Sequence, residues 1–260
     1  SLLTILKLNY KILGSGPPLI ILHGLFGMLD NWRTIARMLE NKYQCILVDL
    51  RNHGRSPHDE EMNYNVMAED VLELMNDLHI EHSYLMGHSM GGKVAMLFAL
   101  TYPEKVDKLI VVDIAPKEYP IHHAAEIEAI ESVDPAILEN RTEAEELLRK
   151  KLGDDQATIQ FLLKNLSRKS EGGFEWKANM PVLISNYDKL MEGIVKPGTF
   201  DKPVLFISGQ MSDSIRDEDL PDILTLFPSA RLSTVPNAAH WVHADQPEAL
   251  KNEVLAFIDG

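Results

Sequence analysis

Short apolar, β-branched runs alternate along this chain with longer segments of helical pattern, and few folds accommodate that order. The runs that we predict to be strands are 18–22, 45–49, 83–87, 108–113, 203–208 and 231–235. Several are apolar on both faces, as strands buried inside a parallel sheet must be. Helices are predicted between them, at 31–40, 65–78, 90–101, 217–227 and 246–258. The alternation therefore predicts an α/β fold, with a mostly parallel sheet and helices on both of its faces.

Two stretches depart from this alternation. Residues 1–13 are expected to add an antiparallel hairpin at one edge of the sheet. Between residues 115 and 200 we find no convincing strand, and the helical patterns there lie near 121–133, 142–151, 156–167 and 184–192. We therefore expect residues 1–114 and 201–260 to form the core and residues 115–200 to form an inserted helical cap. Such a cap is either a packing subdomain or, if the strand ends beneath it carry chemistry, a lid over a site.

The charge and the cysteine content of the chain limit which partners and which cellular compartment we expect for it. Its 260 residues carry a formal net charge of −14, from 25 Lys and Arg against 39 Asp and Glu. An acidic surface repels phosphate backbones, so we expect no nucleic-acid partner. No apolar run approaches the roughly 20 residues of a membrane span. The lone Cys45 can form no intrachain disulfide and the first residues lack a signal-peptide pattern, so we expect a cytoplasmic protein.

The strongest chemical signal is the sequence Gly87-His88-Ser89-Met90-Gly91, which lies between a predicted strand and a predicted helix. This is the context of a nucleophile elbow, in which a serine on a tight turn exposes its hydroxyl to the site. The flanking glycines let the strand and helix backbones approach closely. The helix start supplies a free N–H at Met90 and the positive end of the helix dipole. We predict that Ser89 is a nucleophile; a chance glycine-rich turn is the alternative.

A second signal is the segment HGLFG at 23–27, directly after a predicted strand. Acyl transfer needs two N–H donors aimed at the oxyanion that develops in the transition state. We expect the backbone N–H groups of Leu25 and Met90 to supply them. For the His23 side chain we favour a structural role that braces this loop over a direct role in catalysis.

Five blocks of the sequence, taken in order, resemble the α/β-hydrolase superfamily. They are HGLFG, DLRNHGRSP (49–57), GHSMGGK (87–93), DIAP (113–116) and AHWVHADQP (239–247). Within the superfamily they look most like the YbfF-type bacterial esterases and their alpha/beta hydrolase domain relatives. The resemblance implies a Ser-His-Asp hydrolase that acts on acyl esters or thioesters, with no metal or organic cofactor.

A serine nucleophile needs a histidine to accept its proton, and in this fold that histidine follows the last strand. His240 lies there, in Asn237-Ala238-Ala239-His240-Trp241, where relatives often carry glycines before the histidine. His243, three residues later, is its rival. We predict that His240 is the general base. Nothing in the spacing of the histidines indicates a metal site.

Two positions compete for the acid that orients this histidine. Many relatives place it three residues after a glycine that follows the penultimate strand, where this chain has Ser212, with Asp213 one residue late. Asp113 ends an earlier apolar strand, and a carboxylate buried there needs a partner. The YbfF-type esterases resemble this chain in using the earlier aspartate. We therefore predict Asp113 as the acid and Ser212 as an auxiliary polar group; an ordinary turn serine is nearly as good a reading of Ser212.

One polar turn and several apolar side chains carry further predictions. The polar turn at 49–56 is dense enough to suggest catalysis, but we favour a structural role for it. Apolar side chains that could line an acyl pocket, or equally belong to the core, are Phe26, Met28, Tyr119, Trp176 and Trp241.

The sequence thus predicts a serine hydrolase whose small-molecule substrate is an acyl ester or thioester. A carbon–carbon bond hydrolase or a menaquinone-pathway-type lyase could use the same scaffold, although these commonly carry the acid at the later position. The alternative from outside the enzymes is a small-molecule receptor that has the hydrolase fold but does not turn over its ligand.

Overall fold

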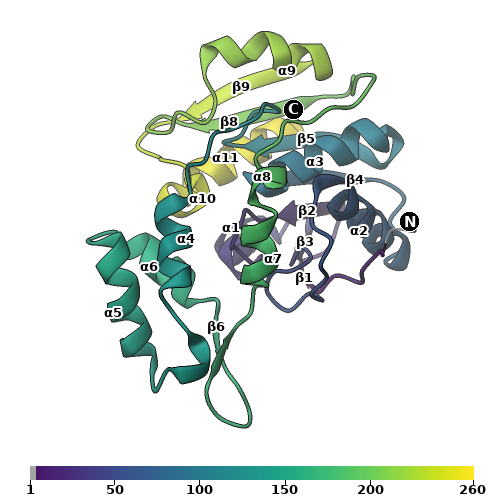
Figure 1. Ribbon diagram of the computed structural model, residues 1–260. Coiled ribbons are helices and arrows are strands. Elements are labelled where there is room, and N and C mark those ends of the chain that lie inside the picture. Colours follow the sequence, from purple (N-terminus) through teal and green to yellow (C-terminus); the bar gives the residue numbers. More distant parts are fainter. Residues whose placement is uncertain (1–3) are drawn as a thin grey trace.

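A seven-stranded sheet forms the centre of the computed structural model, which describes residues 4–260 (Figure 1). Its strand order is β1-β3-β2-β4-β5-β8-β9, and all neighbouring pairs are parallel except β1 with β3. The strands are β1 (Tyr10–Leu13), β2 (Pro18–Leu22), β3 (Gln44–Val48), β4 (Ser83–His88), β5 (Val106–Val112), β8 (Val204–Gly209) and β9 (Ala230–Val235). The six predicted strands and the mostly parallel sheet are therefore confirmed.

The antiparallel edge pairing expected of residues 1–13 is present in β1, but the expected hairpin is wrong. Over residues 4–13 only one strand forms: β1 pairs antiparallel with β3, with Tyr10 opposite Val48. Residues 1–3 lie outside the described residues. The reason is that the chain before β1 gives its backbone polar groups to side chains. Leu6 N–H donates to Asp70 at 2.8 Å, and Thr4 C=O accepts from Arg51 at 2.7 Å, which leaves these residues no reason to pair as a strand.

Helices cover both faces of the sheet. They are α1 (Arg33–Leu39), α2 (Tyr64–Asp77), α3 (Met90–Thr101), α9 (Leu220–Leu226), α10 (Val242–Asp245) and α11 (Pro247–Asp259), with 3-10 turns η1 (Leu29–Trp32), η2 (Pro103–Lys105) and η4 (Asp217–Asp219). Side chains of β2 alternate between the faces: Leu19 and Ile21 pack with α1 and α11, whereas Ile20 and Leu22 pack with α2 and α3. Among the described residues, no helix combines the length and apolar character needed to cross a membrane.

The segment between β5 and β8 is mainly helical, as predicted, but it also contains a small sheet. Its helices are α4 (Ala124–Glu131), α5 (Arg141–Leu152), α6 (Gln156–Leu163), α7 (Met180–Ser185) and α8 (Tyr187–Leu190), with the 3-10 turn η3 (Pro135–Ile137). The antiparallel strands β6 (Leu166–Arg168) and β7 (Phe174–Trp176) contradict the expectation of no strand between 115 and 200. Each of these strands has only three residues, which is too few to show an alternation of apolar and polar side chains in the sequence. This explains why they were not predicted. In Figure 1, α4, α5 and α6 stand together on one side of the sheet.

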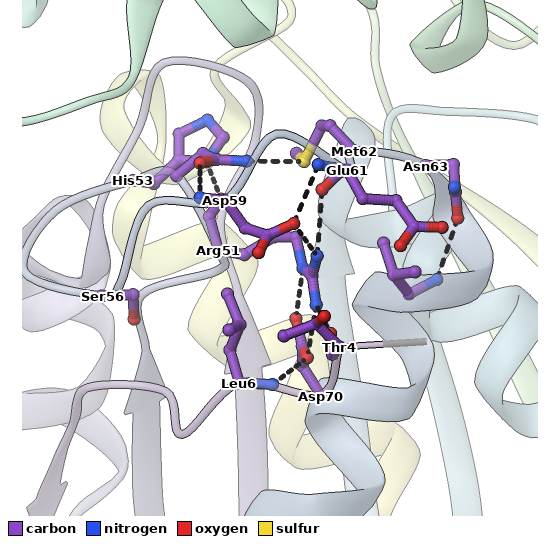
Figure 2. A network of polar contacts seen from close by, with 12 residues as sticks. Thr4, Leu6, Arg51, His53, Ser56, Asp59, Glu61, Met62, Asn63 and Asp70 are labelled. Atoms are coloured by element: carbon purple, nitrogen blue, oxygen red, sulfur yellow. Dashed lines mark hydrogen bonds and ion pairs between the residues drawn. The ribbon is translucent and has the colours of Figure 1, made fainter. Parts of the chain in front are cut away.

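A buried ion pair anchors the polar turn that follows β3 (Figure 2). The guanidinium of Arg51 donates two hydrogen bonds to the Asp70 carboxylate, at 2.6 and 2.9 Å, and both side chains have 0% exposure. Arg51 also donates to the carbonyls of Thr4 and Glu61. The turn therefore joins the N-terminal segment, β3 and α2, which is the structural role expected for it.

Asp70→Asn should destabilise the protein by about 3–5 kcal/mol, because it removes the carboxylate that accepts two hydrogen bonds from the buried Arg51 guanidinium and leaves only Asp59, at 3.5 Å, as a counter-charge. A matched control is Asp77→Asn on the same helix, where the carboxylate pairs with Lys7 at 3.2 Å but both groups are exposed. That change should cost about 1 kcal/mol or less. Urea unfolding of the two variants and the parent measures both values. Equal losses of unfolding free energy in the two variants would mean that the buried Arg51–Asp70 pair stabilises the protein no more than the exposed Lys7–Asp77 pair.

Candidate active site

Ser89 lies at a sharp turn between the end of β4 and the start of α3. Its backbone has φ 54° and ψ −120°, a strained conformation for a residue with a side chain. The turn depends on the flanking glycines. A Cβ on Gly87 would lie 2.1 Å from the carbonyl oxygen of Gly91, and a Cβ on Gly91 would lie 2.4 Å from that of His23. No larger residue fits at either position, so this turn requires glycine at 87 and at 91.

Ser89, His240 and Asp113 form a line of hydrogen bonds although they come from distant parts of the chain. The Oγ of Ser89 lies 3.0 Å from Nε2 of His240, and Nδ1 of the same ring lies 2.6 Å from Oδ2 of Asp113. The loop after β9 carries His240, whereas Asp113 follows β5. The rival His243 stacks instead on Trp32, with ring centroids 4.2 Å apart.

Asp113 is fully buried and is held by three groups. Its Oδ1 accepts from the N–H of Gly209 at 2.9 Å, and its Oδ2 accepts from Ser212 Oγ at 2.5 Å and from the His240 ring. Burial raises the pKa of this carboxyl, but the hydrogen bonds outweigh burial and the pKa lies below its usual value. The competing Asp213 is 88% exposed and faces Arg216 at 3.4 Å.

A second serine, whose place the sequence did not reveal, lies in the loop that carries Ser212. Ser214 Oγ is 3.3 Å from His240 Nδ1 and 3.1 Å from Ser212 Oγ. The hydroxyl of Tyr119 donates to the Ser214 carbonyl at 2.5 Å and accepts from Ala115 N–H at 2.9 Å. Tyr119 therefore links the segment after β5 to the loop after β8.

The HGLFG loop packs directly against the elbow. A Cβ on Gly24 would lie 3.3 Å from the Ser89 Cβ. The His23 ring donates to the carbonyl of Gly24 at 2.8 Å and accepts from the N–H of Leu50 at 3.0 Å. Burial lowers the pKa of His23 to about 4, so the ring is neutral at pH 7. These contacts give His23 the bracing position that we expected.

The two residues whose N–H groups are expected to hold an oxyanion lie beside Ser89. Leu25 and Met90 line one small cavity together with Ser89. Met90 is the first residue of α3, where a helix leaves its N–H groups without intrahelical partners. In the described chain we find no protein acceptor opposite the Leu25 N–H. The arrangement leaves both donors available to a ligand atom.

His88 is a further residue whose role the sequence did not reveal. Its Nε2 lies 2.8 Å from the carbonyl oxygen of His240, and its ring contacts those of His240 and His243 at centroid distances of 4.8 Å. Burial and the neighbouring rings hold the pKa of His88 well below its usual value. A neutral His88 thus donates a hydrogen bond to the backbone of the loop that carries His240.

A cavity of about 530 Å³ opens above Ser89 and His240. Phe26 and Trp241 line it, and Phe161 from α6 contacts Trp241 with ring centroids 4.7 Å apart. The other predicted pocket residues lie elsewhere. Met28 is buried, and Trp176, the last residue of β7, packs against the core. Neither lines the cavity, and Tyr119 lines only the smaller cavity.

Charged side chains at the large cavity are all acidic among the residues that the structure describes. They are Glu126, Asp155, Asp213 and Asp245, accompanied by histidines but by no lysine or arginine. Lys93 lies under the inserted segment instead, where its ammonium group donates to the carbonyl of Glu192 at 2.6 Å and faces the Tyr119 ring. Burial lowers the pKa of Lys93 to about 8.

Over residues 4–260, no group of three His, Cys, Asp or Glu side chains is placed to hold a metal ion.

Comparisons with known proteins agree with this architecture. A family model described as alpha/beta hydrolase fold matches residues 17–247. The chain is 38% identical to Esterase YbfF of Escherichia coli (strain K12), with 93% of each chain covered. It is 37% identical to sn-1-specific diacylglycerol lipase ABHD11 of Danio rerio, over 94% of this chain and 79% of that protein. A solved structure named "Marine microorganism esterase" is 43% identical, with a TM-score of 0.95 over 97% of this chain and 99% of the other. The chain therefore belongs to the α/β-hydrolase family, as an alpha/beta hydrolase of the YbfF type.

Proposed function

We propose that this protein is a serine hydrolase that cleaves acyl esters through an acyl-enzyme intermediate. The observation that carries the proposal is the line of hydrogen bonds from Ser89 through His240 to Asp113. These are the contacts that nucleophile, general base and orienting acid must make. Relatives named as an esterase and a diacylglycerol lipase support the same reaction class.

In the proposed mechanism, the Oγ of Ser89 attacks the ester carbonyl carbon while Nε2 of His240 takes the hydroxyl proton. Asp113 accepts the Nδ1–H of His240 and stabilises the imidazolium that forms. The N–H groups of Leu25 and Met90 bind the oxyanion. His240 then gives its proton to the leaving alcohol, and the acyl group stays on Ser89. Water, deprotonated by His240, releases the acid and restores the serine.

The organisation of the chain fits this reaction. We propose that residues 1–114 and 201–260 are the catalytic core and that residues 115–200 cap the acyl pocket, because Phe161 and other α6 residues line the cavity above Ser89. Ser212 and Ser214 are auxiliary groups beside the acid. The single Cys45 is buried and free, which is compatible with the cytoplasmic location that we propose.

The cavity's charge favours substrates without negative charge near the scissile bond. Four carboxylates line it, and Lys93, which could have supplied a basic mouth, is buried under Glu192 and Tyr119. Like charges disfavour the approach of a polyanion such as coenzyme A. We propose that neutral acyl esters are the substrates, and that a thioester is accepted where its thiol portion is uncharged.

Ser89→Ala should abolish labelling by a fluorophosphonate probe and lower kcat for a nitrophenyl ester by about 10⁴-fold or more, because no acyl-enzyme can form. Intact-protein mass spectrometry and steady-state turnover measure the two effects. Ser83→Ala, at the other end of β4, is the control and should keep both. Labelling of the Ser89 variant at the parent's rate would contradict the assignment. A parent protein that binds esters without multiple turnover would instead be a receptor.

Asp113→Asn should lower kcat by about 10⁴-fold, because an amide at this position supports the wrong tautomer of His240. Asp213→Asn should change kcat by no more than about tenfold, or 1.4 kcal/mol, because that exposed carboxylate makes no contact with the ring. Steady-state kinetics on folded variants, checked by circular dichroism, compare the two. The reverse ranking would assign the acid to the loop after β8.

Butyryl-pantetheine should be hydrolysed with a kcat/KM at least about tenfold above that of butyryl-CoA at low ionic strength, because only the second carries phosphates into the field of the carboxylates. The two substrates share one thioester bond, so intrinsic reactivity cancels. Added salt should lower the ratio of the two kcat/KM values, because ions screen the repulsion between carboxylates and phosphates. Glu126→Gln should lower this ratio as well, because it removes one of the carboxylates. A preference for butyryl-CoA would show that the acidic lining does not select substrates.

A further inference from the structure

The HGLFG turn holds one residue in a conformation that it would not choose alone. Phe26 has a backbone φ of 64°, in the left-handed region that favours glycine. The turn closes through a hydrogen bond from Gly27 N–H to Gly24 C=O at 3.0 Å. A positive φ at the third residue is typical of a type II turn, whose usual occupant there is glycine. Surrounding groups must therefore hold Phe26 in place.

Both backbone polar groups of Phe26 are held by side chains from opposite directions. From the core, Nε2 of His53 accepts the Phe26 N–H at 3.1 Å. From the inserted segment, the Nδ2 of Asn165 donates to the Phe26 carbonyl at 2.7 Å. Both peptide planes beside Phe26 are thus fixed, one by each partner. Loss of either bond would let the strained residue relax and would move the turn that carries the Leu25 N–H.

Asn165 is itself rigidly placed at the junction of α6 and β6. Its N–H donates to Leu162 C=O at 3.0 Å, and its carbonyl accepts from Lys177 N–H at 2.6 Å. The side chain has 0% exposure, and its Oδ1 is buried with no hydrogen-bond partner. A buried amide oxygen without a partner is costly. Stability alone therefore does not account for an asparagine at this position.

We propose that Asn165 is a positioning residue through which the inserted segment fixes the oxyanion donor of Leu25. This inference rests on the proposed function, in which that N–H binds the oxyanion. The inserted segment then does more than cover the acyl pocket, since the loop is complete only when Asn165 reaches Phe26. Binding of substrate in the ground state does not need this donor, whereas the transition state does.

The test compares Asn165→Leu, which keeps the size of the side chain but cannot donate, with the parent enzyme. We expect kcat for a neutral nitrophenyl ester to fall by about 10- to 100-fold, less than the loss of a whole oxyanion donor, with KM little changed. The inhibition constant of an alkyl trifluoromethyl ketone should rise by a similar factor, because its adduct with Ser89 carries the same oxyanion. The pH profile of kcat/KM should keep the parent's midpoint, since the triad is untouched.

Asn179→Leu is the matched control. Asn179 also joins the inserted segment to the core, through a hydrogen bond from its Nδ2 to Asn52 Oδ1 at 3.1 Å, but it does not contact the HGLFG turn. It should leave kcat and the ketone's inhibition constant near parent values. Asn165→Ser serves as a second variant if the leucine variant does not fold, with the same losses expected.

Parent-like kcat and ketone affinity in a folded Asn165 variant would overturn the inference. Equal losses in the Asn165 and Asn179 variants would also overturn it, because they would indicate general loosening of the inserted segment. Neither result touches the proposed function, which depends on labelling and turnover of the parent at Ser89. Absence of that labelling would instead reject the proposed function.

Discussion

A carboxylate buried beneath the strand ends, Asp113, is the constraint on which the rest of the site depends. An ionised group with no exposed surface must find partners, because its desolvation is expensive. Its partners are the Gly209 N–H, the Ser212 hydroxyl and the His240 ring. The loops after β8 and β9 can satisfy it only by bringing these groups to one point. The place of the histidine beside Ser89 is therefore a consequence of how the fold accommodates one charge.

The elbow imposes a second constraint, which comes from space and not from charge. The backbones of β4 and α3 come so close at Gly87 and Gly91 that the chain between them must adopt the strained conformation of Ser89. The same closeness brings Gly91 against the end of β2, so the HGLFG loop begins beside Ser89. One steric requirement thus places the nucleophile and the loop with the expected oxyanion donor side by side.

The sequence predicted those parts of the fold and site whose signals are local. Buried parallel strands are apolar throughout, and Ser89 and Asp113 each lie at or just after the end of a predicted strand. Both could therefore be placed on one edge of the sheet from the sequence. Signals that depend on distant contacts could not be read. Packing between distant segments sets three such features. They are the pairing of β1 with β3, the short β6–β7 hairpin and the contact of Asn165 with Phe26. Trp176 failed as a pocket residue for the same reason, because an aromatic side chain looks alike in sequence whether it lines a cavity or a core.

The histidines around the site show how burial keeps the surroundings of one base neutral. Burial lowers the pKa of His53 and of His243 to about 3, and the pKa of His88 is also held low. Each therefore stays uncharged at neutral pH and serves as a fixed donor or acceptor for a backbone group or as a packing surface. A positive charge on any of them would oppose the imidazolium that His240 must become during attack. With these rings neutral, the Asp113 carboxylate is the charged group in direct contact with the His240 ring.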